Sequence, residues 1–189
     1  MTRRWLGAGL ALAVLAVLAG CGADGGGTRM PSASPAAQRW YAACPAPRGP
    51  ATGSPSLPDL SLTCAHDGRS VPLRKAYGKP TVINLWASWC EPCRTELPHI
   101  QRYADEHPDV VVLTVDTRDT RSAGVSFAKD AGVRLPTLLD PRQRLLAGVG
   151  RSALPVTLLV RADGGLARTY NGTALTTDRL AALVDRELT

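Results

Sequence analysis

The stretch "NLWASWCEPCRTELP", Asn84 to Pro98, places two cysteines three residues apart directly after an apolar run. A Cys-x-x-Cys pair either binds a metal ion or exchanges electrons as a dithiol and a disulfide. A structural zinc site needs two further ligands, usually a second close cysteine pair or histidines at metal spacing. None of the three histidines stands at such a spacing: His66, His99 and His107. The stretch therefore predicts a redox pair, Cys90 and Cys93, and the sequence indicates neither a metal nor another cofactor.

The residues on either side of the pair predict a strand that leads into a helix. The almost unbroken apolar run 80–87 is typical of a strand buried on both faces. Apolar residues then recur at helical spacing from Glu91 onward, in a helix that Pro98 is expected to kink. Cys90 would open this helix, where free backbone N–H groups and the positive end of the helix dipole stabilise a thiolate. We therefore expect Cys90 to be the attacking group and Cys93, one turn further on, to resolve the mixed disulfide.

Two neighbours of the first cysteine fit this role. Pro92 suits the start of a helix, where its missing N–H leaves no hydrogen bond unmade. Trp89 directly precedes Cys90 and is expected to cover one side of its sulfur.

Strands and helices alternate through the rest of the domain. The expected elements are a buried strand at 109–116, a helix at 122–132, a short strand at 135–140, two strands around a turn at 163–165, and an amphipathic helix at 177–188. This order predicts an α/β fold, in which a central mixed β-sheet is flanked by helices on both faces.

The charge of the chain argues against a nucleic-acid partner. The formal net charge of +6 is spread along 189 residues, without any Lys/Arg-rich run. A nucleic-acid surface would concentrate this charge on one stripe or patch. We therefore expect no binding to nucleic acid.

The N-terminus carries the pattern of an export signal. Two arginines precede an apolar run from about Trp5 to Ala19, which is shorter than the roughly 20 residues that a spanning helix needs. A basic start, a short apolar middle and small residues at the end predict a signal peptide over residues 1–20. The end, "LAGC", resembles the lipobox of bacterial lipoproteins, which implies that Cys21 is acylated and anchors the protein at the extracytoplasmic face of the cell membrane. A retained membrane helix and an ordinary cleaved signal are the alternatives.

A Gly-, Pro-, Ala- and Ser-rich segment, 21–57, follows and is expected to be a flexible tether to a domain at 58–189. If the redox pair closes locally, Cys44 and Cys64 are left for each other, and outside the cytoplasm they would form a structural disulfide. A second redox pair, or a zinc site that joins both pairs, stays open as an alternative.

The stretch "GKPTVINLWASWCEPCRTELP", followed about 60 residues later by "ALPVTLLV", resembles the TlpA/ResA family of thiol-disulfide oxidoreductases. These are membrane-anchored proteins with the thioredoxin-like fold, and the resemblance extends over roughly residues 57–189. It implies that Pro155 is the cis-proline of the loop that faces the cysteines, and that Leu154 beside it touches them. It also implies that Glu96 is the acidic residue kept near the active site, where it would assist proton transfer around Cys93. Asn84, which cannot take a proton, stands where thioredoxin has a buried Asp.

The resemblance implies a reductant that acts on disulfides of exported proteins, such as apocytochrome c before haem attachment. A membrane thiol carrier, for example a CcdA-like protein, would re-reduce it. An oxidant that makes disulfides in exported proteins is the main alternative, since two residues between the cysteines indicate the direction only weakly. A redoxin-type peroxidase would need a Thr where Ala87 stands, and a copper-binding assembly factor would need Cys-x-x-x-Cys and a histidine after His107.

Overall fold

The structure is a computed structural model, and it describes residues 40–189. The expected signal peptide, Cys21 and the first part of the tether lie outside the described residues. Within residues 40–189, no helix combines the length and the apolar character that crossing a membrane requires.

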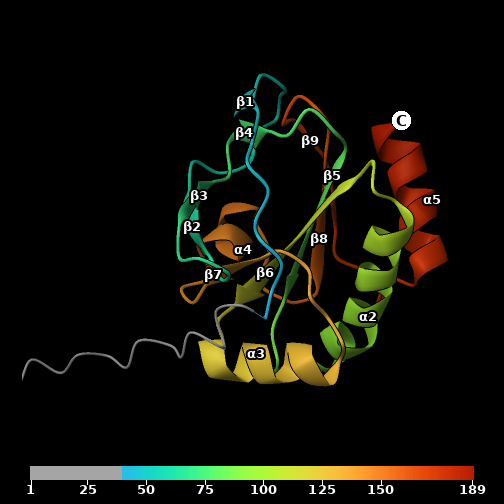
Figure 1. Cartoon of the computed structure of the whole chain (residues 1–189). Helices are drawn as coiled ribbons and strands as arrows, with labels where there is room; N and C mark the ends of the chain where they lie inside the picture. Colours follow the sequence, from blue (N-terminus) through green and yellow to red (C-terminus); the bar gives the residue numbers. More distant parts are fainter. Residues whose placement is uncertain (1–39) are drawn as a thin grey trace, which may run out of the picture. The chain divides into compact units, whose positions relative to one another are not determined.

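One seven-stranded mixed sheet forms the centre of the domain (Figure 1). Its strands, in spatial order, are β3 (Ser70–Pro72), β2 (Ser61–Cys64), β7 (Thr137–Asp140), β6 (Val111–Thr117), β5 (Thr81–Trp86), β8 (Val156–Val160) and β9 (Leu166–Tyr170). Strands β7, β6 and β5 run parallel to one another, and the remaining neighbours pair antiparallel. Two further strands, β1 (Gly49–Pro50) and β4 (Lys75–Ala76), form a small antiparallel pair of their own.

Helices cover both faces of the large sheet. They are α2 (Glu91–Glu106), α3 (Arg121–Asp130), α4 (Arg144–Gly148) and α5 (Thr177–Leu188). Apolar side chains of α2, α3 and α5 pack together in one core cluster, and those of the short α4 belong to a second cluster. Strand β5 contributes to both clusters, with Val82 and Trp86 in the first and Ile83 and Leu85 in the second. The expected thioredoxin-like α/β architecture is confirmed.

Strand β5 explains why its sequence is almost purely apolar. It lies between β6 and β8, and all six of its residues are buried. Side chains on both faces of the strand therefore leave water, which only apolar residues or well-bonded polar ones tolerate. The one strongly polar residue of this strand, Asn84, is hydrogen-bonded inside the domain.

The packed part of the chain begins earlier than the sequence pattern indicated. Tyr41, Cys44 and Leu57, all within the expected tether, are buried in the core clusters. The backbone N–H of Ala42 donates to the carbonyl of Arg134, whose guanidinium also lies 4.4 Å from the Trp40 ring centroid. Residues 40–57, which composition placed within the tether, therefore pack against the domain, because a few aromatic, aliphatic and sulfur side chains anchor a segment that is otherwise rich in Pro, Ala and Gly.

A disulfide joins this early segment to the sheet. Cys44 and Cys64 are bonded, and they are separated by 20 residues in the sequence. Cys64 ends β2 and pairs with Leu138 of β7, so the bond fastens the segment to an inner part of the sheet. Closing a loop of this length stabilises a folded chain by about 3 kcal/mol.

Several short elements were not expected from the sequence. Strands β1 and β4 have two residues each, and β3 has three, so none carries a readable alternation. Helix α4 has five residues and follows Gln143, which has a left-handed backbone with φ of 54°. Such short elements form because neighbouring segments pair with them, which no local pattern reveals.

Candidate active site

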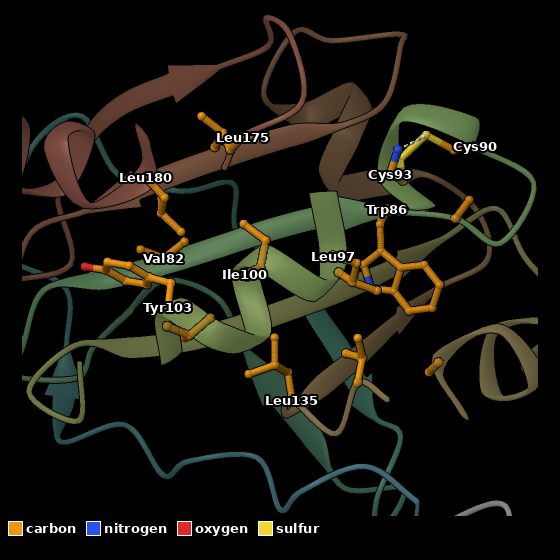
Figure 2. Packing of buried hydrophobic residues seen from close by; sticks show 14 of the residues in the cluster. Val82, Trp86, Cys90, Cys93, Leu97, Ile100, Tyr103, Leu135, Leu175 and Leu180 are labelled. Atoms are coloured by element: carbon orange, nitrogen blue, oxygen red, sulfur yellow. Dashed lines mark hydrogen bonds between the residues drawn. A yellow bond between two sulfur atoms is a disulfide. The ribbon is translucent and has the colours of Figure 1, made fainter. Parts of the chain in front are cut away.

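The redox pair lies where β5 ends and α2 begins (Figure 2). After Trp86 the chain makes a tight turn, in which the Cys90 N–H donates to the carbonyl of Ala87 over 3.2 Å. Cys90 is the N-cap of α2, and its sulfur accepts a hydrogen bond from the Cys93 N–H over 3.3 Å. The two cysteines form a disulfide. Pro92 lies in the first turn, where a missing N–H costs nothing.

Cys90 is the better placed of the two sulfurs for attack. Its residue is 5% exposed, whereas Cys93 is 1% exposed. Once the disulfide opens, the N–H of Cys93 and the N-terminus of α2 would stabilise a thiolate at Cys90. Exposure alone does not separate this pair from the other disulfide, because Cys44 is 6% exposed. The position of Cys90 as N-cap of α2 does, since Cys64 is a strand residue that pairs with Leu138 in the sheet.

The loop before β8 carries the residues that the family resemblance placed opposite the cysteines. The Leu154–Pro155 peptide bond is cis. Leu154 packs against both core clusters, including the one that contains the redox pair. Asn171 holds this loop, because its side-chain amide donates to the carbonyl of Pro155 over 2.6 Å and to that of Ala153 over 3.3 Å. Asn171 was not expected from the sequence.

Trp89 stands out on the surface beside the pair. It is 57% exposed, and it is the one large apolar side chain in residues 40–189 that is exposed to this degree. Its indole N–H donates to the carbonyl of Arg118 over 3.0 Å. The β6–α3 loop thus determines how the ring lies, and its cover over the Cys90 sulfur stays a prediction.

Glu96 is buried below the pair, one turn beyond Cys93 on α2. Its Oε1 accepts hydrogen bonds from the Asn84 side-chain amide over 2.7 Å and from the Thr157 hydroxyl over 3.3 Å. Its Oε2 accepts one from the Leu175 N–H over 3.2 Å. The carboxyl group is therefore fixed by β5, by β8 and by the segment before α5.

Burial controls the acidity of this group. Loss of water raises the pKa of Glu96 to about 7, against the opposing effect of the hydrogen bonds from Leu175, Thr157 and Asn84. The carboxyl group can therefore gain and release a proton near neutral pH, as a general acid/base partner must. Asn84, which does not ionise, orients the group without competing for the proton.

Sequence reasoning found Asn84 and Glu96 but missed two of the partners. Thr157 lies 61 residues from Glu96 in the sequence and Leu175 lies 79 residues away. Leu175 contributes only its backbone N–H, so no residue type at that position signals the contact. The motif "ALPVTLLV" contains Thr157, but only the pairing of β5 with β8, Asn84 opposite Thr157, shows which way it faces.

In the part of the chain that the structure describes, no three His, Cys, Asp or Glu side chains are grouped as metal ligands. The Cys90–Cys93 disulfide and the buried carboxyl group of Glu96 support chemistry on sulfur with a proton partner.

Comparisons with known proteins agree with this geometry. A profile of the AhpC/TSA family matches residues 55–169. The chain is 30% identical to the thiol-disulfide oxidoreductase ResA of Bacillus subtilis (strain 168) over 109 residues, which is 57% of this chain and 61% of that protein. The chain thus spans about three fifths of the length of this curated relative.

Two solved structures share the fold at comparable identity. A secreted Mycobacterium tuberculosis disulfide oxidoreductase, homologous to E. coli DsbE, aligns with a TM-score of 0.60 and 25% identity, over 68% of this chain and 96% of that one. The exposed lipoprotein thioredoxin Etrx1 of Streptococcus pneumoniae strain TIGR4 aligns with a TM-score of 0.57 and 28% identity, over 68% and 98% of the two chains.

The raised pKa of Glu96 should show in the pH dependence of stability. Because the folded-state pKa of about 7 lies above the ordinary value of 4.5, the stability linked to this proton is fully present below pH 4.5 and is lost as pH rises through 7. Relative to Glu96→Gln, the wild-type protein should lose about 3 kcal/mol of unfolding free energy between those pH values. Urea unfolding of the oxidised proteins at a series of pH values measures this difference. The contributions of the other titrating groups are the same in the wild type and in Glu96→Gln, so they cancel when the two are compared.

Glu106→Gln, at the exposed end of α2, is the matched control and should follow the wild type at every pH. Parallel stability curves for wild type and Glu96→Gln would show that Glu96 ionises with an ordinary pKa.

Proposed function

The chain belongs to the AhpC/TSA family. From its cysteine pair, Cys90 and Cys93, we propose that the protein is a thiol-disulfide oxidoreductase of the ResA type. The observation that carries the proposal is the Cys90–Cys93 disulfide at the N-terminus of α2, with a buried carboxyl group of pKa about 7 one turn below it.

In the proposed reaction, the reduced protein transfers two electrons to a client disulfide. The Cys90 thiolate attacks one client sulfur, the client S–S bond breaks, and a mixed disulfide and a client thiolate form. Cys93 then gives up its proton and attacks the Cys90 sulfur, which releases the second client thiolate and closes the Cys90–Cys93 disulfide. The client takes up the protons. Glu96, three residues after Cys93 on α2, is the group that we assign to accept a proton as Cys93 ionises and to return it on the way back.

Thiol–disulfide exchange is favoured over peroxide reduction by the residues before the pair. Ala87 stands three residues ahead of Cys90, where a peroxidase of the related redoxins has a Thr. Ala87 is buried and offers no hydroxyl to a peroxide. The second cysteine, three residues on from the first, is instead placed to resolve a mixed disulfide.

We propose that the clients are exported proteins with disulfides, apocytochrome c before haem attachment among them, and that a CcdA-like membrane thiol carrier returns the protein to its reduced state. The "CEPC" sequence and the resemblance to ResA support this assignment. A thiol oxidase on the same scaffold is the second candidate, because the same pair runs in either direction.

The assignment of the two sulfurs is tested by single substitutions. Cys90→Ser should abolish reduction of insulin disulfides, because the attacking thiolate is gone. Cys93→Ser should accumulate a mixed disulfide through Cys90, because nothing resolves it. Non-reducing electrophoresis and peptide mass mapping locate the trapped bond. The two roles would be reversed if Cys90→Ser trapped a mixed disulfide at Cys93 while Cys93→Ser still reduced insulin rapidly.

The direction of electron flow is tested by the reduction potential. A reductant has a relatively stable disulfide form, so the Cys90–Cys93 potential should lie nearer the roughly −270 mV of thioredoxin than the roughly −120 mV of a strong oxidant. Equilibration with glutathione buffers gives this value. A potential above about −150 mV, together with rapid oxidation of a reduced unfolded client, would favour the oxidase.

We also propose that the protein is a lipoprotein of the extracytoplasmic face, from the "LAGC" sequence that ends at Cys21. One of the similar structures is named an exposed lipoprotein. Cys21→Ser should prevent acylation and release most of the protein from membranes, because each buried methylene of an acyl chain contributes about 0.8 kcal/mol to anchoring. Metabolic labelling with a fatty acid and detergent phase partition measure this, with Gly27→Ser as the control. Undiminished membrane retention without label would indicate a retained membrane helix.

A further inference from the structure

A second group of buried polar side chains lies beside the active site and takes no part in the chemistry above. In residues 40–189, four buried side-chain polar atoms have no hydrogen-bond partner in the protein: Tyr41 OH, Trp86 Nε1, Asp116 Oδ1 and Arg121 Nε. Trp86 and Asp116 lie opposite each other in the register of β5 and β6. Arg121 lines a cavity of about 90 Å³ together with Asp116 and Asp119. The unpartnered atoms thus gather around Asp116, where β5 and β6 end.

Asp116 and Asp119 line the same cavity at this place. Asp116 is only 3% exposed, and burial, followed by the charge of Asp119 and a hydrogen bond to it, raises the pKa of Asp116 to about 8. With its pKa raised in this way, the Asp116 carboxyl group carries a proton at neutral pH, and it lines the same cavity as the Asp119 side chain. Gly124 of α3 packs so closely on Asp116 Oδ2 that a Cβ would overlap it, so the helix reaches this carboxyl group only because the residue has no side chain.

Asp119 links this pair to the loop that carries the nucleophile. Its Oδ2 accepts a hydrogen bond from the Ser88 N–H over 2.7 Å, two residues before Cys90. Its Oδ1 accepts one from the Thr120 N–H over 2.8 Å, and the Thr120 hydroxyl caps the start of α3. The carboxylate of Asp119 therefore bridges the end of β5 to a helix terminus that is itself fixed.

A second hydrogen bond joins the same two loops. The indole N–H of Trp89 donates to the carbonyl of Arg118, and the Arg118 N–H donates to the carbonyl of Asp140 over 3.1 Å. Arg118 has a left-handed backbone, with φ of 53°, which is unfavourable for a residue with a side chain. Both of its backbone polar groups are bonded, so contacts on either side hold this conformation.

We propose that Asp119 is a positioning residue for Cys90: it fixes the backbone at Ser88, and the buried carboxyl group of Asp116 holds Asp119 in place. The inference rests on the proposed thiol–disulfide exchange. Attack requires the Cys90 sulfur to stand in line with the client S–S bond, and a small displacement of a reacting group lowers the rate strongly. The hydrogen bonds of Asp119 go to the backbone N–H groups of Ser88 and Thr120, so it acts through the loop.

The carboxyl groups of Asp116 and Asp119 also make this support depend on pH. The groups that face Asp116 are Asp119, the Tyr41 hydroxyl and the Arg121 guanidinium. When Asp116 loses its proton, two negative charges lie at the same cavity, and Arg121, which also lines it, opposes them. Asp119 should then hold Ser88 less firmly, so the positioning should weaken as pH rises through about 8.

The first test compares Asp119→Ala and Asp119→Asn with the wild type. Amide hydrogen exchange of Ser88 in the oxidised protein, followed by NMR, reports the hydrogen bond itself and needs no catalytic activity. Asp119→Ala should lose the protection of Ser88 and reduce insulin about tenfold more slowly. Asp119→Asn should keep most of both, because the Asn Oδ1 still accepts the Ser88 N–H. Asp130→Ala, at the exposed end of α3, is the matched control and should behave as the wild type.

The second test uses Asp116→Asn, which keeps a donor for Asp119 but has no proton to lose. Above pH 8, the ratio of the insulin reduction rate of this variant to that of the wild type should increase, since only the wild type loses the positioning of Ser88 by Asp119. A merely structural role of Asp116 would leave this ratio constant with pH. Urea unfolding of each variant shows that it is folded. Unchanged Ser88 protection and rate in Asp119→Ala, or a flat Asp116→Asn ratio, overturns the inference. A wild type that reduces no insulin, with Ser88 protection lost in Asp119→Ala, contradicts the proposed function instead and leaves the assigned hydrogen bond supported.

Discussion

The burial of β5 on both faces is the constraint on which the active site depends. This strand is paired along its length with β6 and β8, and it ends directly before the turn that delivers Cys90 to the N-terminus of α2. Because the strand cannot slide or tilt without exposing apolar side chains, the turn has a fixed origin. The two neighbouring strands supply groups that surround the site. Thr157 on β8 lies beside Glu96, and Asp116 on β6 lies opposite Trp86, at the end of β5 that leads to Cys90.

Two buried acids flank this strand, and both reduce stability at high pH. Desolvation raises the pKa of Glu96 to about 7 and that of Asp116 to about 8. The stability linked to each proton is present in acid and is lost as pH rises through these values. A stability-optimised core would hold apolar or amide side chains there. Their burial in the same region as the redox pair is typical of groups that are placed for function.

The sequence predicted those features of the site that depend on local order. The Cys-x-x-Cys spacing is read directly from the sequence, and the buried strand before it and the helix after it follow from periodicity. The roles of Asn84 and Glu96 were expected from the resemblance to the TlpA/ResA family. The rest consists of contacts between distant segments, such as Asn171 with Pro155, or Ser88 with Asp119. Composition also gave a wrong expectation of a flexible tether at residues 40–57. The average over many Pro, Ala and Gly residues does not reveal that one tyrosine and one cysteine in this segment are buried.

In the proposed exchange, Glu96 would act as the proton partner in either direction. Closing the Cys90–Cys93 disulfide requires Cys93 to lose a proton, and opening it requires a proton to return. A carboxyl group whose pKa lies near 7 does both at neutral pH with little driving force lost, because neither its acid nor its base form is strongly favoured. In the proposed exchange, proton transfer at Glu96 would therefore control how fast electrons move and not which way. The direction is determined by the relative stability of the Cys90 thiolate and the disulfide. This stability depends on the N-terminus of α2, on the β6–α3 loop and on the loop before β8.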